Sequence, residues 1–216
     1  MRGVLITVGE ESFHTGNDLD LVQETKEISN PSVQTYTVQV PGRDGLLNLT
    51  KSLTGRVCYN NRKIELVYIG TGNRSDLLNL KDRFNSYHGQ TIRIVDDDTP
   101  LYYYEGECDV ECIVKSNYIK ISIEVNALPF RYKTTVSSFN GTVSSTERSR
   151  TIQNPGVPVV PTVTVTEETV MTFSGKSFTL SAGTYTDLDI ILQTGGNTFT
   201  FQGSGNYTIS YQEARI

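Results

Sequence analysis

The sequence predicts a mainly β protein: an N-terminal β-sheet or barrel-like domain crossed by one α-helix, and a small C-terminal β-sandwich of jelly-roll type. Three observations support this fold class. Apolar residues alternate with period two along most of the first half, a single stretch shows helical spacing, and glycine turns separate short alternating runs after residue 150. A chain of 216 residues has room for two small domains of this kind.

The alternating segments of the first half predict half-buried strands, because successive side chains of a strand point to opposite faces. The clearest segment is 118–125, in which every second residue is Ile or Val. Two further apolar sets have the same spacing, and each is expected to share one face of its strand: Tyr36, Val38 and Val40, and Ile64, Leu66 and Tyr68.

One segment, 73–89, predicts a helix instead. Asn73 or Ser75 is suited to cap the free N–H groups of its first turn, and Asp76 is favourable near the positive end of the helix dipole. Gly89 is expected to end the helix, because glycine readily takes the left-handed conformation that follows a last turn. The apolar residues in between recur at helical spacing and should lie across the sheet: Leu77, Leu80, Phe84, and Tyr87 or His88.

The composition changes near residue 133. Residues 1–133 contain 33 of the 43 charged residues, whereas residues 134–216 contain 17 of the 27 threonines. We therefore expect a first domain at 1–135 and a second at 136–216, with a connector at about 136–160. Residues 156–161 are expected to form a stiff, extended connector or a first edge strand, because neither Pro158 nor Pro161 fits a central strand. Short alternating runs with glycines between them predict the strands of the second domain, at 161–165, 198–201 and 207–211.

Composition and charge exclude several classes of protein. The net charge of -5 and the pI near 5.1 argue against a general nucleic-acid binder. No apolar run approaches the length of a membrane span, and the N-terminal apolar stretch is too short for a signal peptide. We therefore expect a chain that folds in a cytoplasm without inserting into a membrane. Three cysteines do not suggest a disulfide framework, since Cys108 and Cys112 on one strand would lie about 13 Å apart.

No segment carries a complete catalytic or cofactor motif. Gly70-Thr71-Gly72-Asn73 joins a strand to a helix but lacks the Lys and Ser/Thr of a phosphate-binding loop. The run Asp96-Asp97-Asp98 offers three carboxylates to a hard cation, yet it lacks the spacing of a calcium loop, and an acidic turn is the simpler interpretation. With two histidines and no nucleophile elbow, we expect no enzyme, no metal and no cofactor.

Two charged features are candidates for contact with a partner. Glu105, Glu107, Asp109 and Glu111 alternate along one stretch, so their spacing places them on one face, toward solvent or a partner. The segment Pro41–Gly45 predicts a rigid corner, because its two glycines permit a positive φ. Arg43 and Asp44 are expected to project from that corner, Arg43 to pair with a neighbour and Asp44 to accept backbone N–H bonds. A folded corner without any partner is the competing interpretation.

An ordered set of short motifs resembles the distal tail proteins (Dit) of long-tailed, siphovirus-type bacteriophages. Pro41-Gly42-Arg43-Asp44-Gly45, followed by Tyr59-Asn60-Asn61-Arg62, is similar to the P-G-R-D-G and Y-x-N-R stretches of that family. The later motifs follow in the family's order and extend the resemblance over residues 1 to about 133: Tyr87-His88-Gly89-Gln90, Asp96-Asp97-Asp98, Tyr102-Tyr103-Tyr104-Glu105-Gly106 and Pro129-Phe130-Arg131-Tyr132.

The resemblance implies a non-enzymatic structural protein that forms a homohexameric ring at the tail tip of the virion, after synthesis in the bacterial host cytoplasm. The first domain would form the ring and stack on the tail tube protein. The second, galectin-like in the family, would point outward and carry the receptor-binding protein or the tail-associated baseplate hub protein. The motifs imply these interface candidates: Pro41, Gly42, Arg43, Asp44, Gly45, Arg62, Asp96, Asp97 and Asp98.

A carbohydrate-binding β-sandwich for host-surface glycans is the alternative function. Its support is the threonine- and glycine-rich second domain, because sugars stack on exposed aromatic rings. The candidate rings are Tyr185, Phe199, Phe201, Tyr207 and Tyr211, although alternation places several of these in a core.

Overall fold

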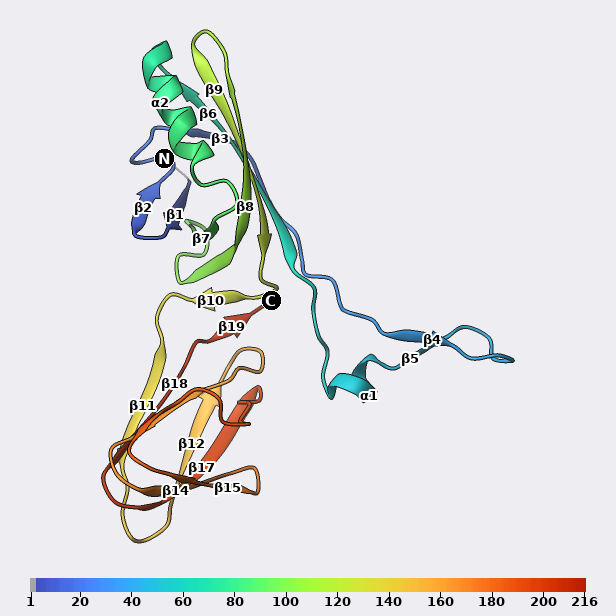
Figure 1. Cartoon of the computed structure of the whole chain (residues 1–216), viewed down its shortest axis with the longest axis vertical. Coiled ribbons are helices and arrows are strands. Elements are labelled where there is room, and N and C mark those ends of the chain that lie inside the picture. Colours follow the sequence, from blue (N-terminus) through green and yellow to red (C-terminus); the bar gives the residue numbers. More distant parts are fainter. Residues whose placement is uncertain (1–2) are drawn as a thin grey trace. The chain divides into compact units, whose positions relative to one another are not determined.

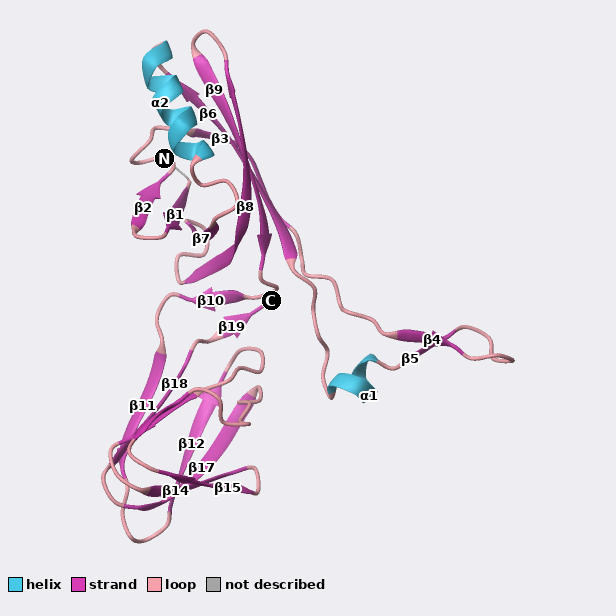
Figure 2. Cartoon of the chain, in the orientation of Figure 1, coloured by secondary structure: helices cyan, strands magenta, loops and turns pink. Residues whose placement is uncertain are grey.

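The structure is a computed structural model that describes residues 3–216, except for the side chains of residues 51 and 54. The chain divides into two compact units, the first reaching Arg131 and including Ile216, the second spanning Tyr132–Arg215. Both units consist mainly of antiparallel strands, which confirms the predicted fold class (Figure 2). No helix among the described residues is long and apolar enough to cross a membrane.

The first unit contains one large antiparallel sheet with the strand order β2-β1-β7-β8-β9-β6-β3. Inward-facing side chains alternate along these strands and fill the core, as the period-two pattern predicted. The strands are β1 (Val4–Val8), β2 (Glu11–His14), β3 (Val22–Ile28), β6 (Arg62–Thr71), β7 (Thr91–Asp96), β8 (Tyr102–Val114) and β9 (Tyr118–Ala127).

The predicted helix is α2 (Arg74–Asn85), which lies against β8 and β9 and buries Leu77 and Phe84. Asn73 is its cap, since its side chain accepts the Asp76 N–H at 3.0 Å. The predicted end at Gly89 is wrong for the α-helix, which stops four residues earlier. Residues 86–88 continue as tighter turns, with each N–H donated three residues back, and Gly89 at φ +75° follows them.

Between β3 and β6 the chain leaves the sheet and forms a long excursion, residues 29–61, which we call the arm (Figure 1). It contains the hairpin strands β4 (Thr37–Gln39) and β5 (Leu46–Asn48) and a short helix, α1 (Thr50–Thr54). The sequence did not predict α1, because five residues are too few to show a helical period.

The second unit is a sandwich of two four-stranded antiparallel sheets around one core. One sheet has the order β11-β18-β13-β16 and the other β12-β17-β14-β15. Two further short strands, β10 (Arg131–Lys133) and β19 (Ala214–Arg215), pair with each other. The sandwich strands are β11 (Ser137–Thr142), β12 (Arg148–Asn154), β13 (Thr162–Val165), β14 (Thr169–Phe173), β15 (Lys176–Leu180), β16 (Gly183–Tyr185), β17 (Gly195–Gly203) and β18 (Asn206–Tyr211).

Residues 136–160, expected to be a connector, hold two of these strands, β11 and β12. The sequence did not indicate these two strands, because β11 is composed of Ser, Asn, Gly and Thr with a single Phe, and the first half of β12 is exposed. Such strands bury too few apolar side chains to show an alternating pattern.

Candidate functional site

The arm carries a hairpin with one apolar face. In the β4–β5 register Val38 lies opposite Leu47, so both side chains are on the same side, and the alternating Tyr36 and Val40 flank them. This apolar face is open: Tyr36 is 51% exposed and Val38 is 47% exposed. Because an isolated two-stranded hairpin is marginally stable in water, the arm is suited to pack against another surface.

The predicted corner Pro41–Gly45 is the tip of this hairpin. Gly42 and Gly45 have φ of +76° and +74°, and an added Cβ at either position would meet nothing within 4 Å. The glycines are therefore required by the backbone conformation and not by crowding. The side chains of Arg43 and Asp44 are exposed, and in the described part of the chain neither forms an ion pair.

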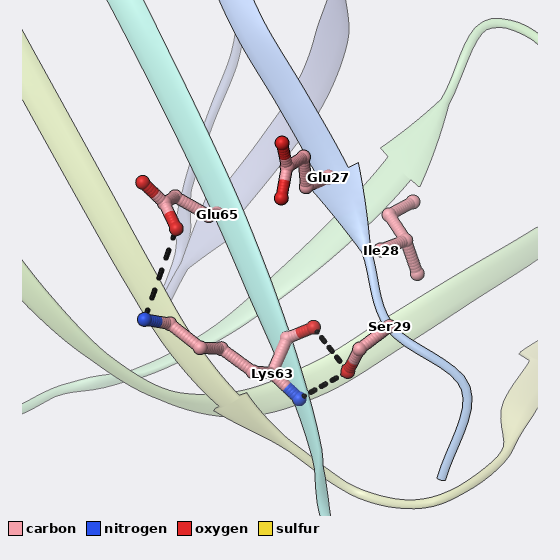
Figure 3. A pocket seen from close by; sticks show the side chains of 5 residues that line it. All are labelled: Glu27, Ile28, Ser29, Lys63 and Glu65. Atoms are coloured by element: carbon pink, nitrogen blue, oxygen red, sulfur yellow. Dashed lines mark hydrogen bonds and ion pairs between the residues drawn. The ribbon is translucent and has the colours of Figure 1, made fainter.

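The outgoing and the returning segments of the arm are hydrogen-bonded to each other where they leave the sheet. The hydroxyl of Ser29 donates to the Lys63 carbonyl at 2.8 Å and accepts the Lys63 N–H at 2.9 Å (Figure 3). A groove of about 350 Å³ lies there, lined by the residues labelled in Figure 3: Glu27, Ile28, Ser29, Lys63 and Glu65. We call this region, together with the adjacent Arg62, the root of the arm.

At the root, three motifs that lie far apart in the sequence come together. Arg62 is 4% exposed, and its Nε donates to the Pro129 carbonyl at 3.0 Å. Its guanidinium lies over the ring of Tyr104, 5.2 Å from the centroid. Tyr59 and Phe130 meet edge to face with centroids 5.7 Å apart. The sequence showed these motifs only as an ordered series, and their common location follows from the folding of β6, β8 and the end of β9.

Arg131 extends this cluster, with its guanidinium 5.1 Å from the ring centroid of Tyr102. Burial, and then the neighbouring positive charge of Arg131, lower the pKa of Arg62. The Nε of Arg131 is buried and has no hydrogen-bond acceptor among residues 3–216. The candidate Arg62 thus lies inside the root of the arm, unlike the tip residues.

The acidic turn Asp96–Asp98 is paired within its own unit. Lys26 Nζ lies 2.8 Å from Oδ1 of Asp96, which is 5% exposed, and 2.7 Å from Oδ2 of Asp98. Although burial opposes it, hydrogen bonds to these two carboxylates raise the pKa of Lys26. Across the described residues, no group of three or more His, Cys, Asp or Glu side chains is arranged to hold a metal ion.

Asp97 has different partners. It accepts the Gly3 N–H at 2.9 Å, and its Oδ1 lies 3.1 Å from His14 Nε2. Burial acts against ionisation, but the hydrogen bonds from His14 and from the Gly3 N–H outweigh it and lower the pKa of Asp97. The ring nitrogen His14 Nδ1 accepts the N–H groups of Gly16 and Asn17, which leaves Nε2 to donate to Asp97.

The outer face of the sheet carries a row of carboxylates across four strands. Glu27, Glu65, Glu124 and Asp109 follow one another in register on β3, β6, β9 and β8. Lys63 lies among them, 2.8 Å from Glu124 and 3.7 Å from Glu65. One lysine among these four carboxylates leaves the row with a net negative charge, and like charges directly opposite one another repel. The sequence predicted the alternation on β8 but not this cross-strand row, which depends on register.

The aromatic residues behind the glycan alternative lie mostly in the core of the second unit. Phe199 is fully buried, Phe201 and Tyr207 stack with centroids 4.0 Å apart, and Tyr211 is 4% exposed. Tyr185 is half-buried and donates its hydroxyl to the Ser181 carbonyl. These rings pack the sandwich and do not form a sugar-stacking surface.

Comparison with known proteins finds a likeness among solved structures. No family model and no curated protein sequence matches the chain. Among solved structures, it is similar to the Dit protein (gp 19.1) of phage SPP1, described as a paradigm of the hub adsorption apparatus in phages that infect Gram-positive bacteria. The TM-score is 0.63, the identity is 17%, and the match covers 99% of each chain. At this identity the likeness establishes the fold, and it confirms the predicted resemblance to distal tail proteins at that level.

Proposed function

We propose that this chain is a structural hub protein of a phage tail tip. It forms a homohexameric ring that joins the tail tube to the host-adsorption apparatus. The proposal is supported by the fold that the chain shares over 99% of its length with a phage hub protein, and by the motif series of the first unit.

The observation that carries the proposal is the arm. It leaves a well-packed sheet and presents an uncovered apolar face, with Tyr36 and Val38 about half exposed. A closed ring requires two different patches on each subunit, one for each neighbour. The arm supplies the first patch and the body of the next subunit supplies the second.

The same proposal names the further partners. The first unit stacks on the tail tube protein, and the second unit points outward to receptor-binding and tail-associated hub proteins. The uncharged Ser and Thr pairs on the outer faces of the sandwich, such as Thr151 with Thr198 and Thr164 with Thr184, leave that unit without a strong electrostatic field of its own.

The test is assembly in solution. Light scattering after gel filtration and negative-stain electron microscopy of the full chain are expected to show six-fold rings, alone or with the tail tube protein added. A variant in which a short Gly/Ser linker replaces residues 31–60 should keep the fold of the body and remain monomeric. A full-length chain that stays monomeric under both conditions contradicts the proposal.

A further inference from the structure

Arg62 and Arg131 form a cationic pair at the root of the arm, within the first unit. Arg62 is 4% exposed and Arg131 is half-buried, and the two lie close enough for the charge of one to lower the pKa of the other. The rings of Tyr104 and Tyr102 lie beside the two guanidiniums, at 5.2 and 5.1 Å. We call these two residues the arginine pair.

The arginine pair has no counter-ion. In the described part of the chain neither guanidinium forms an ion pair with a carboxylate, and the Pro129 carbonyl is the acceptor that Arg62 uses. The Nε of Arg131 is buried and has no acceptor among the same residues. Burying positive charge without an anion is costly, and two adjacent guanidiniums raise that cost. A carboxylate would offset it best, because its two oxygens match the planar fork of a guanidinium.

A carboxylate without a partner is present at the other end of the arm. Asp44, at the hairpin tip, is exposed and forms no ion pair with any described residue. An extended chain from residue 29 to residue 44 spans about 50 Å, which is of the order of a small domain's width. Figure 1 shows the arm running out from the ends of β3 and β6, with its tip away from its own root. Asp44 is thus placed to reach another copy of the chain and not the Arg62 of its own.

We propose that Asp44 of one copy binds Arg131, the half-buried and accessible member of the arginine pair, of the next copy. This inference rests on the proposed function, since it names the contact that closes the ring. Each subunit then contributes a tip to one neighbour and a root to the other, as heterologous contacts in a closed ring require. The sequence motif of the tip and the three motifs of the root become the two halves of one interface.

Charge reversal tests the contact, with Asp44→Arg (D44R) and Arg131→Glu (R131E) measured by native mass spectrometry. Each variant alone opposes like charges at every interface, so the protein concentration needed for half-assembly should rise about tenfold or more. A one-to-one mixture of the two should assemble like the wild type. In a six-membered ring the two variants alternate, and every tip then meets a root of opposite charge.

Three controls keep the test specific. Glu10→Arg in the exposed β1–β2 turn and Arg148→Glu at the exposed start of β12 make equal charge changes elsewhere and should leave ring formation unchanged. Thermal unfolding of each variant checks the fold. If R131E unfolds early, Arg131→Gln replaces it and should weaken assembly by a smaller factor.

The outcomes separate this inference from the proposed function. If the wild type forms rings and D44R and R131E assemble as well as the wild type, the proposed contact is contradicted, whereas the proposed ring is not. A chain that carries both D44R and R131E is measured as well. If each single variant fails and the mixture also fails while this double variant assembles, Asp44 reaches the arginine pair of its own chain and the inference is overturned. If the wild type forms no ring, alone or with the tail tube protein, the proposed function itself is contradicted.

Discussion

Asp96, Asp97 and Asp98 are neighbours in the sequence, but they do not all bind the same partners in the structure. Asp96 and Asp98 share Lys26 on β3, whereas Asp97 binds His14 on β2 and the Gly3 N–H. The sequence indicated an acidic turn, and the structure has one. It did not reveal the partners, because they lie about 70 to 95 residues away and only the strand order brings them together.

Asp97 leads to a prediction about acid stability. Its hydrogen bonds lower its pKa below the value of 3.8 in an unstructured chain, so its carboxylate stabilises the fold above that pH. The contribution is lost as the pH falls through the lowered pKa. We expect Asp97→Asn to be less stable than the wild type at pH 5 and the difference to vanish well below pH 3.8.

Urea unfolding at a series of pH values measures this difference, with Glu10→Gln as the control. Glu10 lies in an exposed turn, so the control should follow the wild type at every pH. A deficit of Asp97→Asn that stays constant down to the lowest pH would show that the substitution acts through packing and not through charge.

At the scale of helices and strands, the sequence predicts the elements that are long enough for their apolar pattern to repeat. Helix α2 has twelve residues and β9 has ten, and both were predicted from their periods. Helix α1, with five residues, was missed, and β11 was assigned to a connector because its exposed and half-buried residues are almost all polar. Alternation predicts which side chains share a face, as it did for Tyr36, Val38 and Val40, but not what covers that face.

The N-terminus of α2 gives a prediction at this scale. The sequence left Asn73 and Ser75 open as caps, and the structure assigns the cap to Asn73, which accepts the Asp76 N–H at 3.0 Å. Asn73→Ala should lower the free energy of unfolding by about 1 kcal/mol, because one N–H of the first turn loses its acceptor. Ser75→Ala should change it by less than about 0.5 kcal/mol. Chemical denaturation of both variants decides between them, and equal losses would contradict the assignment.

At the scale of the whole molecule, the sequence supported two units and an ordered series of motifs. It did not show where these motifs lie in the fold or what they contact. The motifs containing Arg62, Tyr104 and Pro129 converge on the root of the arm, where they hold it to the sheet. Arg62 was expected among the interface candidates together with Arg43 and Asp44, although it is buried and they are exposed. A motif shows that its residues belong together and does not show which of them face outward.

The arm allows stability and assembly to be separated in one experiment. Val38 is 47% exposed and lies on the apolar face of the hairpin, whereas its neighbour Gln39 points to the opposite face. In the isolated chain Val38→Glu removes few contacts, so the free energy of unfolding should change by no more than about 0.5 kcal/mol.

In a ring the same substitution places a charge in an apolar contact, where burying it without a partner is unfavourable. We expect Val38→Glu to remain monomeric at concentrations where the wild type assembles, and Gln39→Glu, with the same charge change on the opposite face, to assemble normally. Light scattering and urea unfolding of both variants make the comparison. If Val38→Glu assembles as well as Gln39→Glu, the apolar face of the arm is not the surface that holds the subunits together.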